Sequence, residues 1–310
     1  MVTSPPALMV ERSGPAMGSR FHLVVTGRDD LDPIADQLIA RLTQLEARWS
    51  RFRPTSEVSQ LNSQPHRGHL VSANTARLVA TACRAWLLTG GAYDPTVLAS
   101  VHSHGYQGSL ITSSGAEPHP MKTEPVSPAP GCAGIEVDLA SRLVRLGSGV
   151  GFDPGGIGKG LAADLVAEAA LELGATGVLV GLGGDIVCRG APPDGHSWPI
   201  DVSEPTVTRH PIAHLQVAAG AVVTSTTRKR HWLTDAGRRH HLVDPRTGLN
   251  TNGPVLATVV AAEGWWAEAV ATQLMVDGPG ATIDWGRAAA VVIDPDGVRH
   301  TVGPIEDYQR

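Results

Sequence analysis

A glycine-rich segment with one lysine contains the residues of this sequence best placed to bind a charged ligand. They lie directly before an apolar helical stretch and are Gly155, Gly156, Gly158, Lys159 and Gly160. Glycine lacks a Cβ atom, so its backbone can approach a ligand closely and adopt positive φ. The free N–H groups and the positive dipole end of a helix attract anions. The segment therefore predicts a nucleotide-type, phosphate-bearing ligand, with a tight structural turn as the alternative.

Two common nucleotide-binding patterns do not fit this segment. The P-loop pattern requires a glycine five residues before its Gly-Lys pair and a serine or threonine after it. Here the first position is Asp153 and the last is Gly160. The dinucleotide pattern G-x-G-x-x-G is absent from the segment as well. The sequence therefore supports neither of the two folds that these patterns characterise.

A carboxylate and a hydroxyl lie one helical turn apart near the end of the chain. Glu268 and Thr272 are four residues apart in an expected helix, so they share a face. Two such oxygen ligands can bind a hard cation. The alternative is a solvated helix face, on which both side chains contact water.

His241 is a candidate general base, because an imidazole can exchange a proton near neutral pH. It lies in an expected strand, 240–244, which places His241 and Val243 on one face. A surface histidine beside the following turn is the alternative. Further upstream, the hydroxyl run 224–227 and the basic run 228–230 could hold a phosphate or form a solvated hairpin face.

The elements that must position these residues follow from hydrophobic period and turn residues. Helices are expected from Asp32, as N-cap with Pro33 at the first position, and over 72–87, 158–173 and 265–276. Strands are expected at 21–26, 177–182, 186–189, 198–203, 214–218, 221–224, 231–234, 240–244, 255–261, 289–294 and 298–302. The sum is an α+β fold in which helices flank a mostly antiparallel sheet.

Length and composition restrict the remaining possibilities. The 310 residues are 42% hydrophobic with a formal net charge of -5, which suits a protein with a large core and argues against a general nucleic-acid binder. No apolar run is long enough for a membrane span, and we expect no signal peptide and a cytoplasmic location. We expect one domain, 1–310, with a loop-rich insertion at about 103–134, where Pro, Ser, Gly and His are frequent.

Taken in order, the motifs of this chain resemble the ApbE-type family of FAD:protein FMN transferases. No single motif decides the resemblance, but their shared order is specific. They are Ala16–Ser19, Ser50–Arg53 with Ser56–Asn62, Gly91–Val97, the glycine-rich segment, Val180–Ile186, Val223–Ser225, His241–Gly248 and Glu268–Thr272.

The resemblance implies a T-fold-like α+β architecture and a Mg²⁺-dependent reaction. The FMN half of FAD would be transferred to a Thr or Ser hydroxyl of a target flavoprotein, with release of AMP. By resemblance, His241 is the general base, and the metal ligands are Glu268, Thr272 and the carbonyl of Gly158. The flavin contacts implied are Met17, Phe52, Ala92, Tyr93, Asp94, Gly155, Leu161 and Val243.

Two positions depart from the family pattern and keep alternatives open. Glu268 stands where the family usually has aspartate, and its extra methylene alters the geometry offered to Mg²⁺. After Thr224-Ser225 the family continues with glycine and a tyrosine, whereas this chain has Thr226 and Thr227, which affects contacts on the adenine side. The alternatives are an FAD pyrophosphatase, in which water replaces the protein hydroxyl, and a non-catalytic FAD-binding protein.

Overall fold

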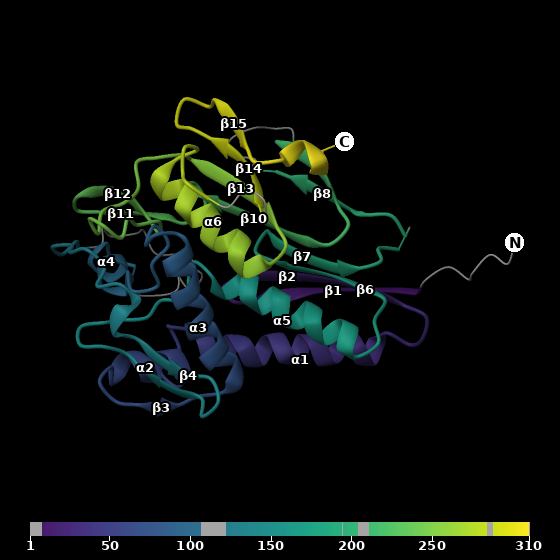
Figure 1. Cartoon of the computed structure of the whole chain (residues 1–310), viewed down its shortest axis with the longest axis horizontal. Coiled ribbons are helices and arrows are strands. Elements are labelled where there is room, and N and C mark those ends of the chain that lie inside the picture. Colours follow the sequence, from purple (N-terminus) through teal and green to yellow (C-terminus); the bar gives the residue numbers. More distant parts are fainter. Residues whose placement is uncertain (1–7, 107–121, 194, 204–210, 284–287, 310) are drawn as a thin grey trace, which may run out of the picture.

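An eight-stranded antiparallel sheet forms the centre of the structure, a computed structural model that describes residues 8–106, 122–193, 195–203, 211–283 and 288–309. The strand order is β1-β2-β6-β7-β10-β13-β14-β15 (Figure 1). The strands are β1 (Leu8–Ala16), β2 (Ser19–Gly27), β6 (Gly177–Leu182), β7 (Asp185–Gly190), β10 (Gly220–Thr226), β13 (Leu256–Ala261), β14 (Ala288–Ile293) and β15 (Arg299–Val302).

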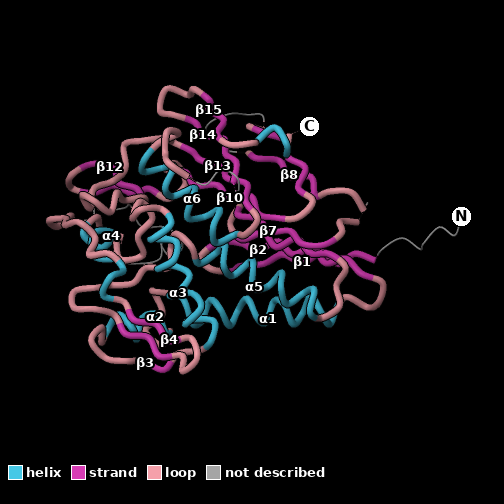
Figure 2. Tube along the Cα trace, in the orientation of Figure 1, coloured by secondary structure: helices cyan, strands magenta, loops and turns pink. Residues whose placement is uncertain are grey.

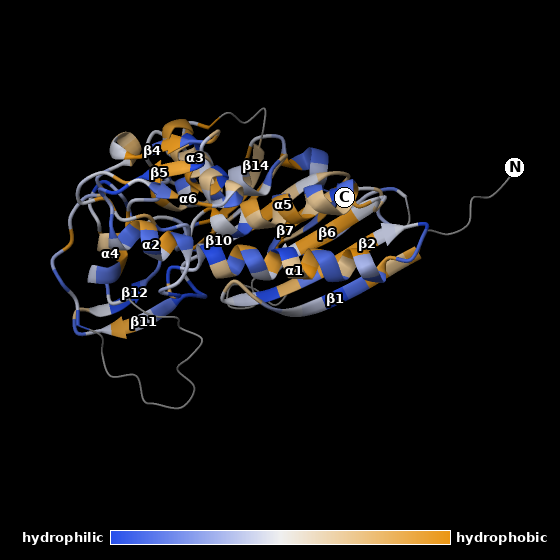
Figure 3. Cartoon of the chain, turned by 90° about the horizontal axis from the view of Figure 1, so that it is seen from below, coloured by the Kyte–Doolittle hydropathy of each residue, from blue (hydrophilic) through white to orange (hydrophobic). Residues whose placement is uncertain are grey.

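The inner strands are buried on both faces, which explains their continuous apolar sequences. Every residue of β6, β13 and β14 is buried, and Figure 3 shows hydrophobic residues along β6. By contrast, β1 at the sheet edge alternates exposed and half-buried residues over most of its length. A strand covered on both faces carries no polar alternation, so its sequence reads as an apolar run.

Helices cover one face of the sheet and enclose the main core. They are α1 (Asp32–Trp49), α3 (Ala73–Leu88), α5 (Gly158–Glu172) and α6 (Gly264–Asp277). Both α5 and α6 are almost entirely buried; α5 contacts β6 and β7, and α6 contacts β10 and β13. In Figure 1 these two helices lie against the sheet, and α1 and α3 pack outside them.

The opposite face of the sheet is covered by a hairpin and a short helix. The hairpin joins β8 (Trp198–Val202) to β9 (Ala213–Val217), and the 3₁₀ helix η4 (Ile305–Tyr308) follows β15. Their apolar side chains form a second core with sheet residues such as Leu179, Val222 and Val291. The sheet is therefore the middle layer of three.

Smaller elements gather at one end of the molecule, beside the starts of α5 and α3 (Figure 2). They are α2 (Glu57–Ser63), α4 (Leu98–Ser103), the 3₁₀ helix η2 (Cys132–Gly134), the sheet of β3 (His69–Leu70), β5 (Leu143–Arg145) and β4 (Glu136–Asp138), and the hairpin of β11 (His231–Thr234) and β12 (Gly237–His240). Much of the motif sequence lies in the connections between these elements.

The expected α+β class, with a mostly antiparallel sheet flanked by helices, is confirmed. In the part of the chain that the structure describes, no helix is long and apolar enough to cross a membrane. Residues 107–121 of the expected insertion lie outside the described residues; of the remainder, 122–131 contain no helix or strand. The single-domain assignment stays a prediction.

Two local predictions were wrong. Asp32 is the first residue of α1 and not its N-cap; Leu31 holds that position without a side-chain hydrogen bond, and the Asp32 carboxylate pairs with Arg12 instead. The strand expected over 240–244 ends at His240. Beyond it the chain turns, because the Asn250 side chain occupies the hydrogen-bonding groups that a neighbouring strand would use.

Candidate functional site

Helices α5 and α6 meet at their N-termini, and each receives a carboxylate from the other. Neither helix has a side-chain cap of its own. Asp164 of α5 accepts hydrogen bonds from the backbone N–H groups of Gly264 at 2.9 Å and Trp265 at 3.0 Å. Glu268 of α6 accepts one from the N–H of Gly160 at 2.7 Å. These donors lie in the first helical turns, where backbone N–H groups lack an intrahelical acceptor.

Close packing explains two of the glycines in the glycine-rich segment. A Cβ on Gly160 would overlap the carbonyl oxygen of Gly264, and a Cβ on Gly156 would lie 3.0 Å from the Tyr93 ring. None of Gly155, Gly156, Gly158 and Gly160 has a positive φ. Of the two properties of glycine considered from the sequence, positive φ is therefore not used here, and Gly156 and Gly160 instead allow close approach between helices and side chains.

Glu268 lies in a buried ionic cluster, so the solvated helix face considered for it is excluded. Its side chain is only 4% exposed, and its Oε1 lies 3.3 Å from the Lys159 ammonium. The same ammonium pairs with the buried carboxylate of Asp185. Burial lowers the pKa of Lys159, and the Glu268 charge opposes that shift. One lysine thus lies between two carboxylates at the start of α5.

Thr272 and Tyr93 complete the wall of this region. The Thr272 hydroxyl donates to the carbonyl oxygen of Glu268 at 3.1 Å. Tyr93 is almost fully buried, and its hydroxyl has no hydrogen-bond partner within the described chain. Burial raises the pKa of Tyr93 well above its usual value, with the Glu268 charge as the next cause. A buried hydroxyl without a partner marks a place where a ligand atom can bind.

The oxygen atoms in this region match the preference of a hard divalent cation. Glu268 would offer a carboxylate oxygen, Thr272 a hydroxyl and Gly158 a backbone carbonyl. Each carboxylate oxygen of Glu268 engages one donor and keeps a further lone pair. Across the described residues, no group of three or more His, Cys, Asp or Glu could hold a metal. A bound Mg²⁺ would therefore complete its shell with water and ligand phosphate oxygens.

The turn after α3 is held by its own hydroxyl and carboxyl groups. The Thr89 hydroxyl accepts a hydrogen bond from the Tyr93 N–H at 3.1 Å. Asp94 Oδ1 accepts from the N–H of Thr96 at 2.7 Å and from its hydroxyl at 2.6 Å. Burial raises the pKa of Asp94, and the bonds from Thr96 oppose that shift. Ala92 is buried beside them, so this segment presents a rigid backbone to the site.

Phe52 is connected to the glycine-rich segment through Arg51 and Asp153. The Arg51 guanidinium lies over the Phe52 ring at 4.3 Å and pairs with Asp153 at 3.5 Å, with both charged side chains buried. Asp153 Oδ1 also accepts from the Gly155 N–H at 2.8 Å. The Phe52 ring is 38% exposed, which leaves an aromatic face for a flat ligand.

His241 has a defined tautomer in this structure. Its Nδ1 lies 3.3 Å from the carbonyl oxygen of Arg230, which can only accept, so Nδ1 carries the proton and Nε2 is the basic atom. Burial, followed by the Arg230 charge, lowers the pKa of His241 to about 3. The imidazole is therefore neutral at physiological pH, as a proton acceptor must be.

Asn250 fixes the backbone on both sides of His241. Its amide nitrogen donates to the carbonyl of His240 at 2.6 Å and to that of Leu242 at 3.1 Å, while Val243 and Asn250 form an isolated β-bridge. The turn that follows closes on itself, since Gly248 N–H donates to the Asp244 carbonyl at 2.8 Å. The position of the imidazole is thus set by a side chain nine residues later.

The remaining predicted contacts lie on separate elements. Met17, with φ 50°, and Gly18, with φ 67°, form the two-residue turn of the β1–β2 hairpin. Leu161 is fully buried in the main core, and Val243 is buried after β12. The structure links Thr272 to Glu268 by a hydrogen bond, and a Cβ on Gly156 would lie 3.0 Å from Tyr93 and 3.4 Å from the Thr272 hydroxyl. Met17 lies in the β1–β2 turn, and Val243 follows β12.

Three further residues with a clear role were missed as site residues, and Lys159 was named only as part of the glycine-rich segment. Lys159 and Asp185 form the ionic cluster, and Arg51 and Asp153 support Phe52 and Gly155. All four stand within motifs that the sequence had already marked, but only side-chain burial shows that they are paired. For Lys159, its position as the one lysine within the glycine-rich segment was the sequence feature that marked it as a candidate site residue.

Comparison with known proteins shows which family this chain matches. The sequence model of the ApbE family matches residues 17–292. FAD:protein FMN transferases of Vibrio cholerae and Haemophilus influenzae are 29% and 26% identical to this chain, covering 88% and 87% of it and 83% and 81% of their own lengths.

Solved structures agree as well. The ApbE protein of Thermotoga maritima superposes with a TM-score of 0.84 at 25% identity, covering 98% of this chain and 100% of its own. The flavin transferase ApbE of Vibrio cholerae gives a TM-score of 0.78 at 24% identity, covering 98% and 100%. On the family match and the shared fold, this chain belongs to the ApbE family.

Proposed function

We propose that this protein is a Mg²⁺-dependent FAD:protein FMN transferase acting on a threonine or serine hydroxyl of a target flavoprotein. The names of its relatives support the reaction class. The observation that carries the proposal is the cluster at the start of α5, where Glu268, Thr272 and Lys159 meet beside a helix N-terminus. The cluster combines oxygen ligands for a cation with positive groups for a phosphate.

The flavin would bind against the segments around Phe52 and Tyr93. Phe52 offers a partly exposed ring, and the unpartnered Tyr93 hydroxyl offers a hydrogen-bond donor. Asp94, Ala92, Gly155 and Leu161 would form the wall, together with Met17 and Val243. The pyrophosphate would then lie near Gly158 and Lys159, at the positive dipole end of α5.

Transfer requires one bond to form and one to break at phosphorus. The acceptor hydroxyl oxygen bonds to the FMN phosphorus, and the bond from that phosphorus to the bridging oxygen breaks. AMP leaves with the bridging oxygen. Mg²⁺, when bound through Glu268, Thr272 and Gly158, would neutralise charge on the phosphate oxygens. Lys159 adds a fixed positive charge beside the same carboxylate.

His241 would take the proton of the acceptor hydroxyl. Nε2 is the basic atom, because Nδ1 faces the Arg230 carbonyl. A positioned general base contributes roughly 10²- to 10⁴-fold to the rate. The lowered pKa keeps the imidazole neutral at pH 7, which makes it available but weakly basic. Its effect is therefore expected at the lower end of that range.

The test is an incubation of the purified protein with FAD and Mg²⁺, with and without a candidate flavoprotein acceptor. An acceptor heavier by one FMN group, together with AMP, is expected, and chelator should abolish both. Glu268→Ala should lose transfer across Mg²⁺ concentrations. Glu263→Gln is the matched control, since Glu263 is exposed at the start of the same helix and makes no side-chain cap.

The other outcomes identify the alternatives. AMP formed at the same rate without any modified acceptor indicates FAD hydrolysis by water. Tight FAD binding that is indifferent to Mg²⁺, with no AMP over hours, indicates a binding protein. Wild-type transfer by Glu268→Ala would refute the metal assignment. The cytoplasmic location stays a prediction, which fractionation of cells can check.

A further inference from the structure

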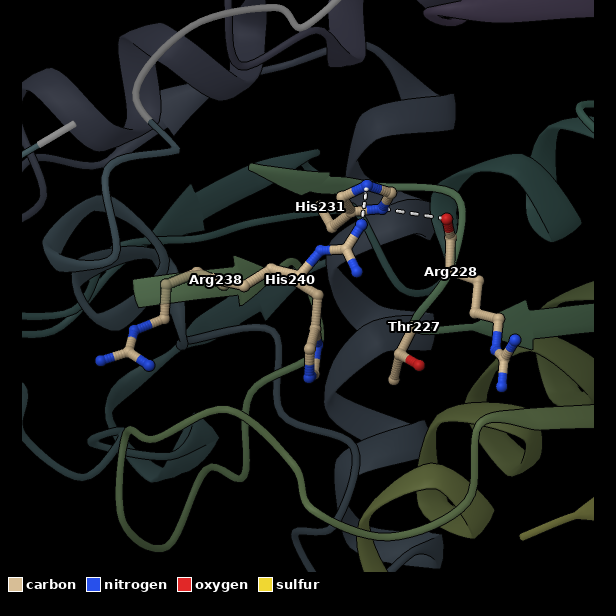
Figure 4. Close-up of a pocket in the computed structure, with 6 residues that line it drawn as sticks. Thr227, Arg228, His231, Arg238 and His240 are labelled. Atoms are coloured by element: carbon tan, nitrogen blue, oxygen red, sulfur yellow. Dashed lines mark hydrogen bonds between the residues drawn. The ribbon is translucent and has the colours of Figure 1, made fainter. Parts of the chain in front are cut away.

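A basic pocket lies on the β11–β12 hairpin, outside the site described above. Its volume is about 520 Å³, within the usual range for ligand pockets. It is lined by Thr227, Arg228, His231, Arg238, Arg239 and His240. None of the residues proposed to hold FAD or the metal lines it. Figure 4 shows that its side chains come from the end of β10 and from both strands of the hairpin.

The hydrogen bonds in this pocket fix one histidine as neutral. Arg238 can only donate, so His231 Nε2 accepts from it at 2.6 Å. His231 Nδ1 then carries the proton and donates to the Arg228 carbonyl at 3.0 Å, as the dashed lines in Figure 4 show. His231 therefore adds no charge; it orients the Arg238 guanidinium.

Two arginines in the pocket have no carboxylate partner in the part of the chain that the structure describes. Arg238 bonds only to the neutral His231, and the Arg239 Nε is buried without a hydrogen-bond partner among the described residues. Asp235, at the hairpin turn, is engaged by Thr123 at 3.1 Å and 2.8 Å. The buried Arg51, by contrast, is paired with the carboxylate of Asp153. The pocket therefore carries a local excess of positive charge on a chain with a net charge of -5.

The pocket adjoins the candidate base through both hairpin strands. His240, which lines the pocket, directly precedes His241, and the Arg230 carbonyl that holds His241 directly precedes His231. A molecule bound in the pocket would therefore lie next to the segment that carries the base.

We propose that this pocket binds carboxylate side chains of the acceptor flavoprotein that flank its target hydroxyl, so that an acidic segment is the preferred acceptor. The assignment of the partner rests on the proposed transferase function; the anion preference does not. Arginine pairs with carboxylates in a bidentate, oriented manner, which suits it to hold an acceptor in one register.

Binding of labelled peptides to the full-length protein tests the proposal without FAD or Mg²⁺. One peptide carries a central threonine flanked by aspartates, and its match carries asparagines at the same positions. Fluorescence anisotropy should show about tenfold tighter binding of the aspartate peptide, the change expected from two oriented charge pairs. The preference should weaken as salt is raised.

Arg238→Gln/Arg239→Gln should abolish this preference. The control Arg28→Gln/Arg299→Gln removes the same charge from exposed positions elsewhere, on the β2–α1 connection and β15, and should retain it. Arg238→Glu/Arg239→Glu should instead favour a lysine-flanked peptide. Thermal unfolding of each variant verifies that it is folded, so loss of binding reports on the pocket.

Three results would overturn the proposal. Equal affinity for the two peptides would show that binding does not depend on the aspartates. An unchanged preference in Arg238→Gln/Arg239→Gln would show that the pocket arginines do not recognise them. AMP binding that depends on these arginines, with no peptide preference, would assign the pocket to a nucleotide. Failure of AMP release from FAD would instead contradict the proposed function and leave the peptide result standing.

Discussion

The α5–α6 junction and the β11–β12 hairpin differ in whether their charged side chains are paired within the described chain. At the junction Asp164, Lys159, Asp185 and Glu268 are buried, and each is paired with an opposite charge or with helix N–H groups. On the hairpin, Arg238 and Arg239 have no carboxylate within the described chain. Both regions adjoin His241, which directly follows β12 and whose pKa is affected by the Lys159 charge.

This difference indicates that the junction charges stabilise the fold and that the hairpin charges bind another molecule. Charges that are internally compensated hold the structure in place, because removing one partner leaves a buried group unsatisfied. Charges without an internal partner contribute little to folding and remain available to another molecule. Substitutions at the junction should therefore lower the stability of the fold, whereas those on the hairpin should change what the protein binds.

The largest effect is expected for Gly160→Ala. The added methyl group would overlap the Gly264 carbonyl oxygen, and neither helix can move without losing its packing. The free energy of unfolding should fall by at least about 3 kcal/mol. Urea titration measures this loss. Gly280→Ala is the control, since no atom lies within 4 Å of its added Cβ, and it should change stability by less than about 1 kcal/mol.

A smaller loss is expected for Asp164→Asn. The amide offers one acceptor oxygen in place of two, so one of the α6 N–H groups loses its partner and Arg189 loses its counter-charge. Unfolding should become easier by about 2 kcal/mol. Glu168→Gln, which breaks the half-exposed pair with Arg77, should cost under about 0.5 kcal/mol. Equal losses for the two variants would remove the distinction between buried and exposed pairs.

His241 should stay neutral well below pH 6.5. Its folded pKa is lowered to about 3, so the unfolded chain takes up the proton first as the pH falls. The contribution to stability is therefore present above pH 6.5 and is lost progressively between pH 6.5 and about 3. NMR should show an imidazole signal that does not shift between pH 5 and 8 and is absent from His241→Gln. A midpoint near 6.5 for that signal would contradict the burial argument.

The smallest effect on folding is expected for Arg238→Gln/Arg239→Gln. Neither guanidinium pairs with a carboxylate among the described residues, so the free energy of unfolding should change by no more than about 0.5 kcal/mol. Urea titration checks this beside the binding measurements. A loss comparable to that of Asp164→Asn would mean that the hairpin charges are structural, and the comparison would fail.

The helices and strands were predicted well because the spacing of their apolar residues follows the periodicity of the helix or strand. The apolar run 177–182 is strand β6, and the helix expected over 72–87 is α3, Ala73–Leu88, with Ser72 as its N-cap. The Gly183-Gly184 break between β6 and β7 is a turn in which both glycines have positive φ. Local chemistry decides such features, so the sequence alone was sufficient.

Long-range contacts could not be predicted in the same way. The end of β12 depends on Asn250, and the need for glycine at position 160 depends on Gly264, more than a hundred residues later. Similarly, the burial of Glu268 follows from the position of α5 and not from the sequence of α6. The site residues came from family resemblance, but their pairing required the fold.

The N-termini of α5 and α6 are each capped by a carboxylate of the other helix, and this mutual capping affects local unfolding of the protein. Each helix start depends on a side chain of the other, so neither can fray alone without exposing the donors of its partner. The amides of Gly160, Gly264 and Trp265 should therefore exchange hydrogen for deuterium as one cooperative unit. A ligand that binds Glu268 would slow exchange in both helices at once, linking occupancy of the site to the local stability of the core.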